Sequence, residues 1–135
     1  MTTAGDESVL RNAMTSVLVV NPDSAARTRI VALLAAAHFD VTACASAAEA
    51  LALLHIARRH AMVVDAELSH GGSVALLRAC VAAGVAPTSI MTTPHGAIGS
   101  AVEAMREGYS DYVPEPFDAR LAQALRSALA SINRP

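Results

Sequence analysis

Residues 16–24 read SVLVVNPDS, a continuous apolar run followed at once by a polar turn. The apolar run lacks polar alternation, which is typical of a parallel strand that is covered on both faces. The residues from Pro22 to Ser24 then form a helix start, and apolar residues follow at helical spacing up to His38. The stretch therefore predicts a buried strand, a tight connection and a helix.

The same alternation of strand and helix continues to the end of the chain. Further strands are expected at residues 41–44, 61–64, 89–93 and 112–113. Further helices are expected at residues 46–56, 97–107 and 118–129, and another follows the chain break at residues 71–73 and ends at Gly84. Five β-α units in strict alternation predict an α/β fold, a doubly wound five-stranded parallel sheet with right-handed crossovers and helices on both faces.

Individual residues indicate where these helices start, stop and face the core. Ser46 and Glu49 have the spacing of a capping box, and Gly84 and Gly108 are placed to end helices. The apolar residues expected to form the core-facing stripes of the second and third helices are Leu51, Leu53, Leu54, Ile56, Leu76, Leu77 and Val81.

Composition limits the class of protein. A chain of 135 residues has the common size of one domain, and its 16% charged and 53% hydrophobic residues exclude intrinsic disorder. A net charge of −2 gives no electrostatic reason to expect nucleic-acid or anionic-membrane binding. All ten cationic side chains are arginines, and the chain contains no lysine.

The polar start of the chain and its cysteines favour a soluble cytoplasmic protein. Residues 1–15 are too polar for a signal peptide, and the apolar runs are too short to span a bilayer. Cys44 and Cys80 lie in apolar segments without metal-ligand spacing, as reduced core thiols do. We expect one domain over residues 16–132 and an N-terminal extension, residues 1–15, whose structure the sequence leaves open.

Polar residues gather where the predicted strands end. The carboxyl ends of parallel strands share one edge of the sheet, which is the usual place for function in this fold class. We call this edge the rim. The residues expected there are Asn21, Pro22 and Asp23 after the first strand, Asp65 and Glu67 after the third, Thr92 and Thr93 in the fourth, and Pro114, Glu115 and Pro116 after the fifth.

In this register the chain resembles the receiver domain of bacterial response regulators over residues 16–132. The resemblance rests on the apolar first strand, an Asp ending the third, a Thr ending the fourth and an aromatic in the fifth ahead of Pro-Phe. The segments AVEAMREG (residues 101–108) and YVPEPF (residues 112–117) match the family especially well. The resemblance implies the flavodoxin-like (βα)5 receiver fold of two-component signalling.

The resemblance also implies roles for three residues. Asp65 takes the place of the phosphoryl-accepting aspartate, and Thr93 that of the threonine whose hydroxyl moves toward the phosphoryl oxygens. Tyr112 takes the place of the aromatic residue whose ring turns inward with it. Taken alone, Asp65 also fits a loop or helix-capping Asp, Thr93 an ordinary sheet Thr, and Tyr112 a half-buried aromatic at the sheet edge.

Two departures from the family concern charge at the rim. Receivers carry an acidic pair after the first strand that holds Mg²⁺ together with the acceptor aspartate, and here the pair is Asn21 and Pro22. Mg²⁺ prefers octahedral oxygen ligands, so a weak metal site or none is expected. Asp23 lies one position further along, where a helix N-terminal role is expected; the alternative is that it bends back as a ligand.

The second departure is Glu115, which stands where the family has a lysine. Phosphoryl transfer depends on cations that neutralise charge on the transferring oxygens. At an effective dielectric constant of about 20, a unit-charge contact at about 4 Å amounts to about 4 kcal/mol before screening. Exchanging an ammonium for a carboxylate therefore predicts a site that is poorly built for phosphorylation.

These observations favour an atypical, non-enzymatic receiver that signals through protein contacts, with Asp65 retained and its Mg²⁺ and phosphorylation site degraded. The expected partner is a histidine kinase or another signalling protein. By resemblance, the contact face is the fourth helix, fifth strand and fifth helix, and a homodimer is one use of it. An ordinary solvated surface also explains the charges on this face, which include Arg106, Glu107, Asp111 and Arg120.

Two other functions stay open at this point. One is a conventional receiver that a histidine kinase phosphorylates at Asp65, with Mg²⁺ as cofactor if the site is competent. The other is a small flavodoxin-like enzyme or ligand-binding protein, which the sequence disfavours because no complete catalytic set is visible.

Overall fold

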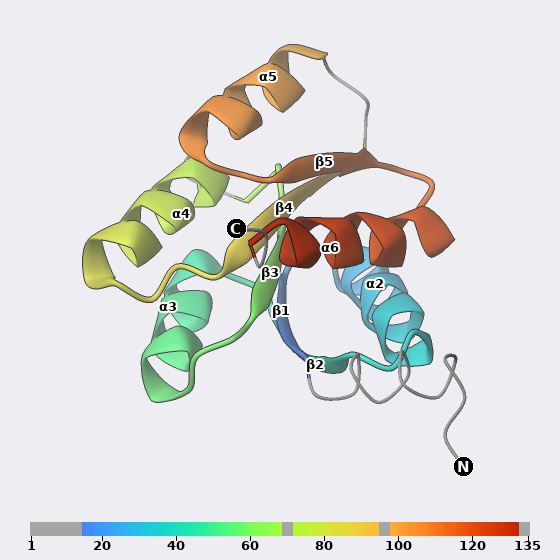
Figure 1. Cartoon of the computed structure of the whole chain (residues 1–135), viewed down its shortest axis with the longest axis horizontal. Coiled ribbons are helices and arrows are strands. Elements are labelled where there is room, and N and C mark those ends of the chain that lie inside the picture. Colours follow the sequence, from blue (N-terminus) through green and yellow to red (C-terminus); the bar gives the residue numbers. More distant parts are fainter. Residues whose placement is uncertain (1–14, 69–71, 95–97, 133–135) are drawn as a thin grey trace.

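A parallel sheet lies between two layers of helices (Figure 1). The computed structural model describes residues 15–68, 72–94 and 98–132, so the expected N-terminal extension lies outside the described residues except for Thr15. The strands are β1 (Ser16–Val20), β2 (Asp40–Cys44), β3 (Ala61–Asp65), β4 (Thr88–Thr93) and β5 (Asp111–Pro114). The helices are α2 (Ser24–Ala36), α3 (Ala47–Ile56), α4 (Gly72–Ala83), α5 (Ile98–Glu107) and α6 (Ala119–Ile132).

The strand order is β2-β1-β3-β4-β5, and every neighbouring pair is parallel. The order reverses between β1 and β3, which lie side by side with Val20 opposite Val64. Ligands of open α/β sheets bind at the carboxyl ends of the strands beside such a reversal. The predicted doubly wound α/β fold is confirmed, and its reversal point lies at the rim.

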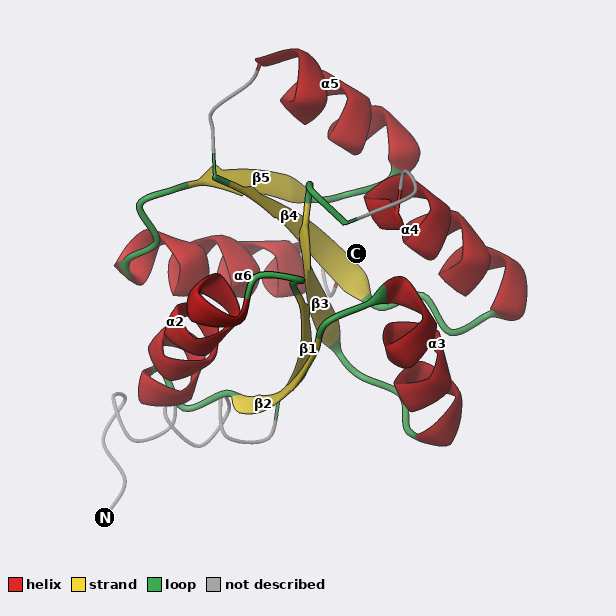
Figure 2. Cartoon of the chain, turned by 180° about the vertical axis from the view of Figure 1, so that it is seen from behind, coloured by secondary structure: helices red, strands yellow, loops and turns green. Residues whose placement is uncertain are grey.

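The two faces of the sheet carry separate apolar clusters, which Figure 2 shows covered by different helices. Successive strand residues point to opposite faces, so the continuous apolar runs supply both clusters. Members on the side of α3, α4 and α5 include Leu18, Val20, Leu54, Met62, Val64, Leu76 and Ala104. Members on the side of α2 and α6 include Val17, Val19, Ile30, Leu34, Val63, Ile90 and Leu121.

The helices start and end at the capping residues that the sequence predicted. The hydroxyl of Ser46 accepts the backbone N–H of Glu49 at 3.2 Å and caps α3. Gly84 and Gly108 adopt positive φ angles of 72° and 113° directly after α4 and α5. A positive φ costs glycine little because it has no Cβ, so these residues turn the chain out of each helix.

The predicted apolar stripes of α3 and α4 were wrong at one residue each. Ile56 is 81% exposed, because it lies two residues, or about 200° of helical rotation, beyond the buried Leu54. Val81 is 65% exposed, because it lies about 100° around the helix from the buried Cys80. Leu51 and Leu53 are half-buried against the core, and the remaining predicted stripe residues are buried.

Candidate functional site

Asp65 ends β3 at the rim and is 6% exposed. The hydroxyl of Thr92, its partner in register on β4, donates to Oδ1 at 3.4 Å. The backbone N–H of Glu67 donates to Oδ2 at 3.0 Å. Burial raises the pKa of the Asp65 carboxyl, and the charges of Glu67 and Glu115 raise it further, whereas the two hydrogen bonds lower it. Both carboxylate oxygens therefore have protein donors, and the pKa still lies above its ordinary value.

The two threonines at the end of β4 lie on opposite sides of the sheet. Thr92 lies two residues after Ile90 in the strand, so both side chains point to the face of the sheet that α2 and α6 cover. Thr93 lies two residues after Met91, so its side chain points to the opposite face, the one against which Tyr112 packs. Both threonines are buried. The predicted switch residues Thr93 and Tyr112 therefore share a face, while the hydroxyl bonded to Asp65 belongs to Thr92, a residue to which the family resemblance gives no role.

Asn21 stands in the place of the first acidic metal ligand and is 1% exposed. Its Oδ1 accepts the backbone N–H of Asp23 at 2.9 Å, and the guanidinium of Arg27 donates to its backbone oxygen at 2.7 Å. The remaining side-chain atom, Nδ2, is buried without a hydrogen-bond partner in the described part of the chain. Because an amide N–H has no lone pair to offer a metal ion, the free group at this position is of the wrong kind for Mg²⁺.

Asp23 is used by the helix that follows it. Its Oδ1 accepts the backbone N–H of Ala25 at 3.0 Å, which confirms the predicted capping role at the start of α2. Pro22 has no ligand atom in its side chain. Among the described residues, no group of three or more His, Cys, Asp or Glu side chains is placed to hold a metal ion. Asn21, Pro22 and Asp23 therefore do not supply the acidic pair with which the family holds Mg²⁺.

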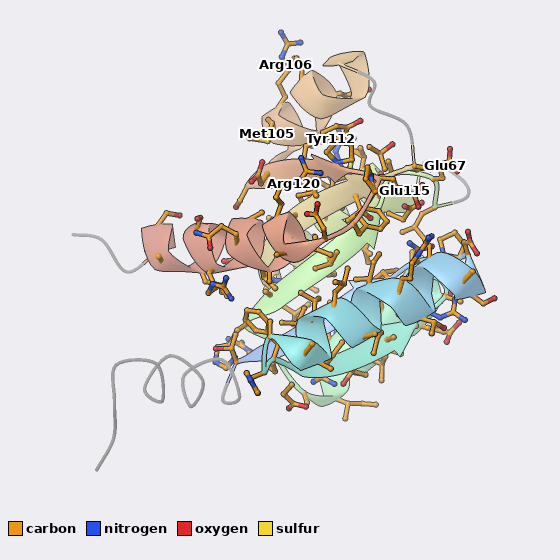
Figure 3. All side chains as sticks on the ribbon, turned by 90° about the vertical axis from the view of Figure 1, so that its right-hand side faces the viewer. Glu67, Met105, Arg106, Tyr112, Glu115 and Arg120 are labelled. Carbon is orange, nitrogen blue, oxygen red and sulfur yellow. The ribbon has the colours of Figure 1, made fainter. Side chains whose placement is uncertain are left out.

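Glu115 follows β5 and is paired with a cation from a distant helix. Its carboxylate contacts the guanidinium of Arg29 at 3.4 Å, and its backbone N–H donates to the carbonyl of Thr93 at 2.9 Å. Figure 3 shows Glu67 and Glu115 at the same end of the sheet. The negative charge of Glu115 contributes to the raised pKa of Asp65, although burial is the main cause.

Arg29 is a cation that the sequence analysis missed. It lies on α2, 86 residues before Glu115, and no local pattern indicates that the two meet. The Arg29 side chain is 63% exposed and that of Glu115 is 32% exposed, so solvent screens the pair. Besides Arg27, which donates to the backbone oxygen of Asn21, Arg29 thus brings a guanidinium to the rim, where it is engaged by the carboxylate that replaces the family's lysine.

The predicted contact face runs along α5, β5 and α6. In Figure 3, Met105 and Arg106 lie on α5, Tyr112 on β5 and Arg120 on α6. Met105 is 48% exposed. A shallow pocket beside β5 and α6 is lined by Asp111, Tyr112, Val113, Pro114, Arg120 and Ala124.

Two of the predicted charges on this face are paired within the chain. Glu107 accepts two hydrogen bonds from Arg78 of α4, at 2.7 and 2.9 Å, and Arg120 pairs with Asp118 at 3.0 Å. Arg106 is exposed. The face therefore combines exposed apolar atoms with charges that are in part already neutralised.

The comparisons agree with this architecture. Residues 17–126 match the response regulator receiver domain family. The chain belongs to this family, whose members are signalling domains of two-component systems.

Its curated relatives include longer transcriptional regulators. The chain is 34% identical over 118 residues to the C4-dicarboxylate transport transcriptional regulatory protein DctD of Rhizobium meliloti. It is 33% identical over 112 residues to the transcriptional regulatory protein FixJ of Azorhizobium caulinodans. These alignments cover 87% and 82% of this chain, but 26% and 53% of DctD and FixJ. The chain thus spans about a quarter and about half of their lengths.

Solved structures give the same result. The crystal structure of FixJ-N superposes with a TM-score of 0.79 at 28% identity, covering 90% of this chain and 98% of that one. NtrX from Brucella abortus, crystallised in complex with ATP, superposes with a TM-score of 0.80 at 26% identity, covering 86% of this chain and 27% of NtrX.

Proposed function

We propose that this receiver domain is atypical and signals through protein contacts without depending on Mg²⁺-assisted phosphorylation. The observation that carries the proposal is the rim position of Asn21, where an amide N–H with no partner among the described residues stands in place of a carboxylate oxygen. The capping role of Asp23 and the exchange of the family's lysine for Glu115 support it. Asp65 is retained, and its partners are protein donors.

Electrostatics point in the same direction. A phosphoryl group on Asp65 would add negative charge to a site that already contains Glu67 and Glu115, both of which raise the pKa of Asp65. Of the two guanidinium groups near the rim, that of Arg29 is mostly exposed and paired with Glu115, and that of Arg27 donates to the backbone oxygen of Asn21. Transfer lacks the positive charge that lowers its barrier in other phosphoryl-transfer sites.

Restoring the family's charges tests the proposal. The triple variant Asn21→Asp, Pro22→Asp, Glu115→Lys regains the acidic pair and the ammonium; removal of the fixed φ of proline allows some local rearrangement. We expect beryllofluoride or acetyl phosphate to label the variant at Asp65 in the presence of Mg²⁺, and the natural domain little or not at all. Mass spectrometry and NMR measure labelling, and Asp65→Asn in both backgrounds is the control.

Equal, stoichiometric labelling of the natural and triple-variant domains would support the conventional receiver instead. That second candidate is favoured by one observation, the retention of Asp65, Thr93 and Tyr112 in the positions that the family uses. It requires that a histidine kinase phosphorylate Asp65 despite the altered rim.

The same proposal includes a partner surface, a cellular compartment and the absence of enzymatic activity. We assign contacts with a histidine kinase or another signalling protein, or with a second copy of the domain, to the face formed by α5, β5 and α6. We place the domain in the cytoplasm and assign it no nucleic-acid contact. None of the described helices is both long and apolar enough to cross a membrane.

Sedimentation at rising concentration tests the homodimer. Met105→Glu places a charge on the exposed part of the α5 face, whereas Val81→Glu makes the same change on α4, outside that face. If the domain dimerises through this face, Met105→Glu shifts the equilibrium toward monomer and Val81→Glu does not. Equal effects would assign association to another surface.

A further inference from the structure

A short run of basic residues connects α3 to β3 at the end of the sheet opposite the rim. Residues 55–60 read HIARRH, with two arginines, two histidines and no carboxylate, and we call them the basic segment. The whole chain has a net charge of −2, so the segment has the opposite sign to the chain that carries it. In Figure 1 this connection lies in the lower part of the view, whereas α5 and β5 lie at the top. The segment is therefore separate from both the rim and the α5, β5 and α6 face.

The end of the segment is fixed to the neighbouring strand. The backbone N–H of His60 donates to the carbonyl of Ser16 at 3.0 Å, and the N–H of Ser16 donates to Nδ1 of His60 at 3.0 Å. Because Nδ1 accepts an N–H, the hydrogen of the imidazole ring lies on Nε2. His60 thus has a fixed ring with a second nitrogen that can donate to a partner.

Neither arginine of the segment is paired with a carboxylate among the described residues. The guanidinium of Arg59 donates to the carbonyl of Ala57 at 2.8 Å and reaches the hydroxyl of Thr42 at 3.5 Å. These oxygens are neutral, so they orient the guanidinium without cancelling its charge. Arg58 is exposed. Asp40 begins β2 at the same end of the sheet, but it forms no ion pair with either arginine in the described part of the chain.

Interaction with the last carbonyls of α3 explains only part of the segment. His55 donates to the carbonyl of Leu51 at 2.7 Å, as basic side chains near a helix C-terminus commonly do. Ile56, the next residue, is 81% exposed, more than any other large hydrophobic side chain of the described residues. Protein interfaces combine an apolar centre with arginine, and an exposed isoleucine two residues from an exposed guanidinium offers both.

We propose that the basic segment is a docking site for an acidic segment of a partner protein, in which carboxylates flank an apolar side chain. The apolar side chain would contact Ile56, and the carboxylates would pair with Arg58 and Arg59. A guanidinium presents parallel N–H donors that match the two oxygens of a carboxylate, so arginine suits this partner well. Nε2 of His60 supplies a further donor.

The same features favour a protein over the other polyanions. Nucleic acids and anionic membranes bind through broad positive surfaces, whereas this segment has two arginines on a chain of negative net charge. The exposed Ile56 also has no use in a contact with phosphate groups. An acidic and apolar peptide satisfies both the charge and the apolar surface.

NMR titration of the isotope-labelled full chain tests the proposal, with a synthetic peptide that carries one leucine flanked by glutamates as the probe. We expect chemical-shift changes in residues 56–60 and Ser16, with a Kd of about 1 mM at low salt. The same peptide with glutamines in place of its glutamates should give much smaller changes. Raising the salt concentration to about 0.3 M should weaken the binding, because the charges of the segment are exposed.

Matched variants make the result specific to the segment. Arg58→Glu should weaken peptide binding about tenfold, whereas Arg126→Glu, the same charge change on α6, should leave it within about twofold. Ile56→Ser should also weaken binding, and Val102→Ser, an exposed position of α5, should not. Circular dichroism checks that all four variants keep the fold of the natural domain.

Either of two results would overturn the proposal. The first is the absence of shifts in the basic segment, or shifts that Arg58→Glu leaves unchanged. The second is tighter binding of a short DNA duplex, or of vesicles that contain phosphatidylglycerol, than of the glutamate peptide. Neither measurement depends on labelling at Asp65, so this inference stands or falls separately from the proposed function.

Discussion

Asn21 differs from an aspartate by one group, and that group changes what the rim can bind. Its Oδ1 is engaged by the N–H of Asp23, so the atom left over is a donor. An aspartate in the same orientation would leave an oxygen, which is the kind of ligand that Mg²⁺ takes. A single exchange of O for NH₂ at this position therefore removes one candidate Mg²⁺ ligand from the rim.

The raised pKa of Asp65 makes stability depend on pH in a predictable direction. The folded state binds the proton more tightly than the unfolded chain, so ionisation of Asp65 lowers the free energy of unfolding as pH rises above the ordinary value of 3.8. Relative to the natural domain, Asp65→Asn should therefore gain stability between about pH 3 and pH 7. Urea unfolding at several pH values measures the difference, and a difference that is constant across this range would contradict the assignment.

His38 is a second residue whose conformation predicts an effect on stability. It follows α2 with φ of 71°, a left-handed conformation that costs a side chain about 1–2 kcal/mol. His38→Gly should therefore stabilise the domain by about 1 kcal/mol. Gly84→Ala is the opposite control, because Gly84 has φ of 72° and no atom within 4 Å of an added Cβ. It should destabilise by about 1 kcal/mol, and equal stability of both variants with the natural domain would refute the reasoning.

At the scale of elements, hydrogen bonds connect α4 with α5 and the region just after it, one in the interior and two at the surface. The buried hydroxyl of Tyr109, just after α5, donates to the carbonyl of Ser73 in the first turn of α4. On the surface, Arg78 of α4 forms two hydrogen bonds with Glu107 of α5. The surface pair is exposed to solvent, so the buried bond is the stronger constraint between these helices.

Tyr109→Phe tests the buried contact. It removes the hydroxyl and leaves the Ser73 carbonyl without this donor, which should cost about 1–3 kcal/mol of stability. Amide hydrogen exchange should accelerate in the first turn of α4, while α2, on the other face of the sheet, serves as the internal control. Equal acceleration in both helices would show that the bond does not act locally.

At the scale of the whole molecule, the surface is divided unevenly between the two helical layers. The exposed large hydrophobic side chains of the described residues, Ile56, Val81, Val102 and Met105, all lie on α3, α4 and α5. The layer formed by α2 and α6 carries none among the side chains described up to Ser131. This asymmetry agrees with a contact surface that includes α5, because exposed apolar atoms favour association.

The proposed loss of the metal site predicts how the whole domain responds to Mg²⁺. The stabilisation that a ligand gives to a fold depends on the ratio of its concentration to its Kd. If the natural domain binds Mg²⁺ weakly or not at all, about 10 mM Mg²⁺ should therefore change its Tm by less than about 1 °C. The triple variant, if it binds with a Kd of about 1 mM, should gain about 4 °C. Differential scanning calorimetry with and without EDTA makes the comparison. A rise in the natural domain, or NMR shifts around Asp65 that saturate at low millimolar Mg²⁺, would show that the rim holds the ion after all.

Much of this protein was determined by its sequence alone. The order of strands and helices, their caps, the two-sided burial of the sheet and the position of Asp65 at a strand end all follow from local patterns. They could be predicted because hydrophobic period, capping and turn preferences act within a few residues. The exchanges at Asn21, Pro22 and Glu115 were also visible, because they are departures at known positions of a pattern.

Only the tertiary structure decided which of the gathered residues touch. It brought Arg29 to Glu115 and Thr92, rather than Thr93, to Asp65, and it left the amide Nδ2 of Asn21 without a partner among the described residues. These contacts join segments far apart in the chain, and they depend on strand register, on the face that each side chain takes and on helix placement. No local pattern contains that information, because a contact at the rim depends on the packing of all five strands against both helical layers.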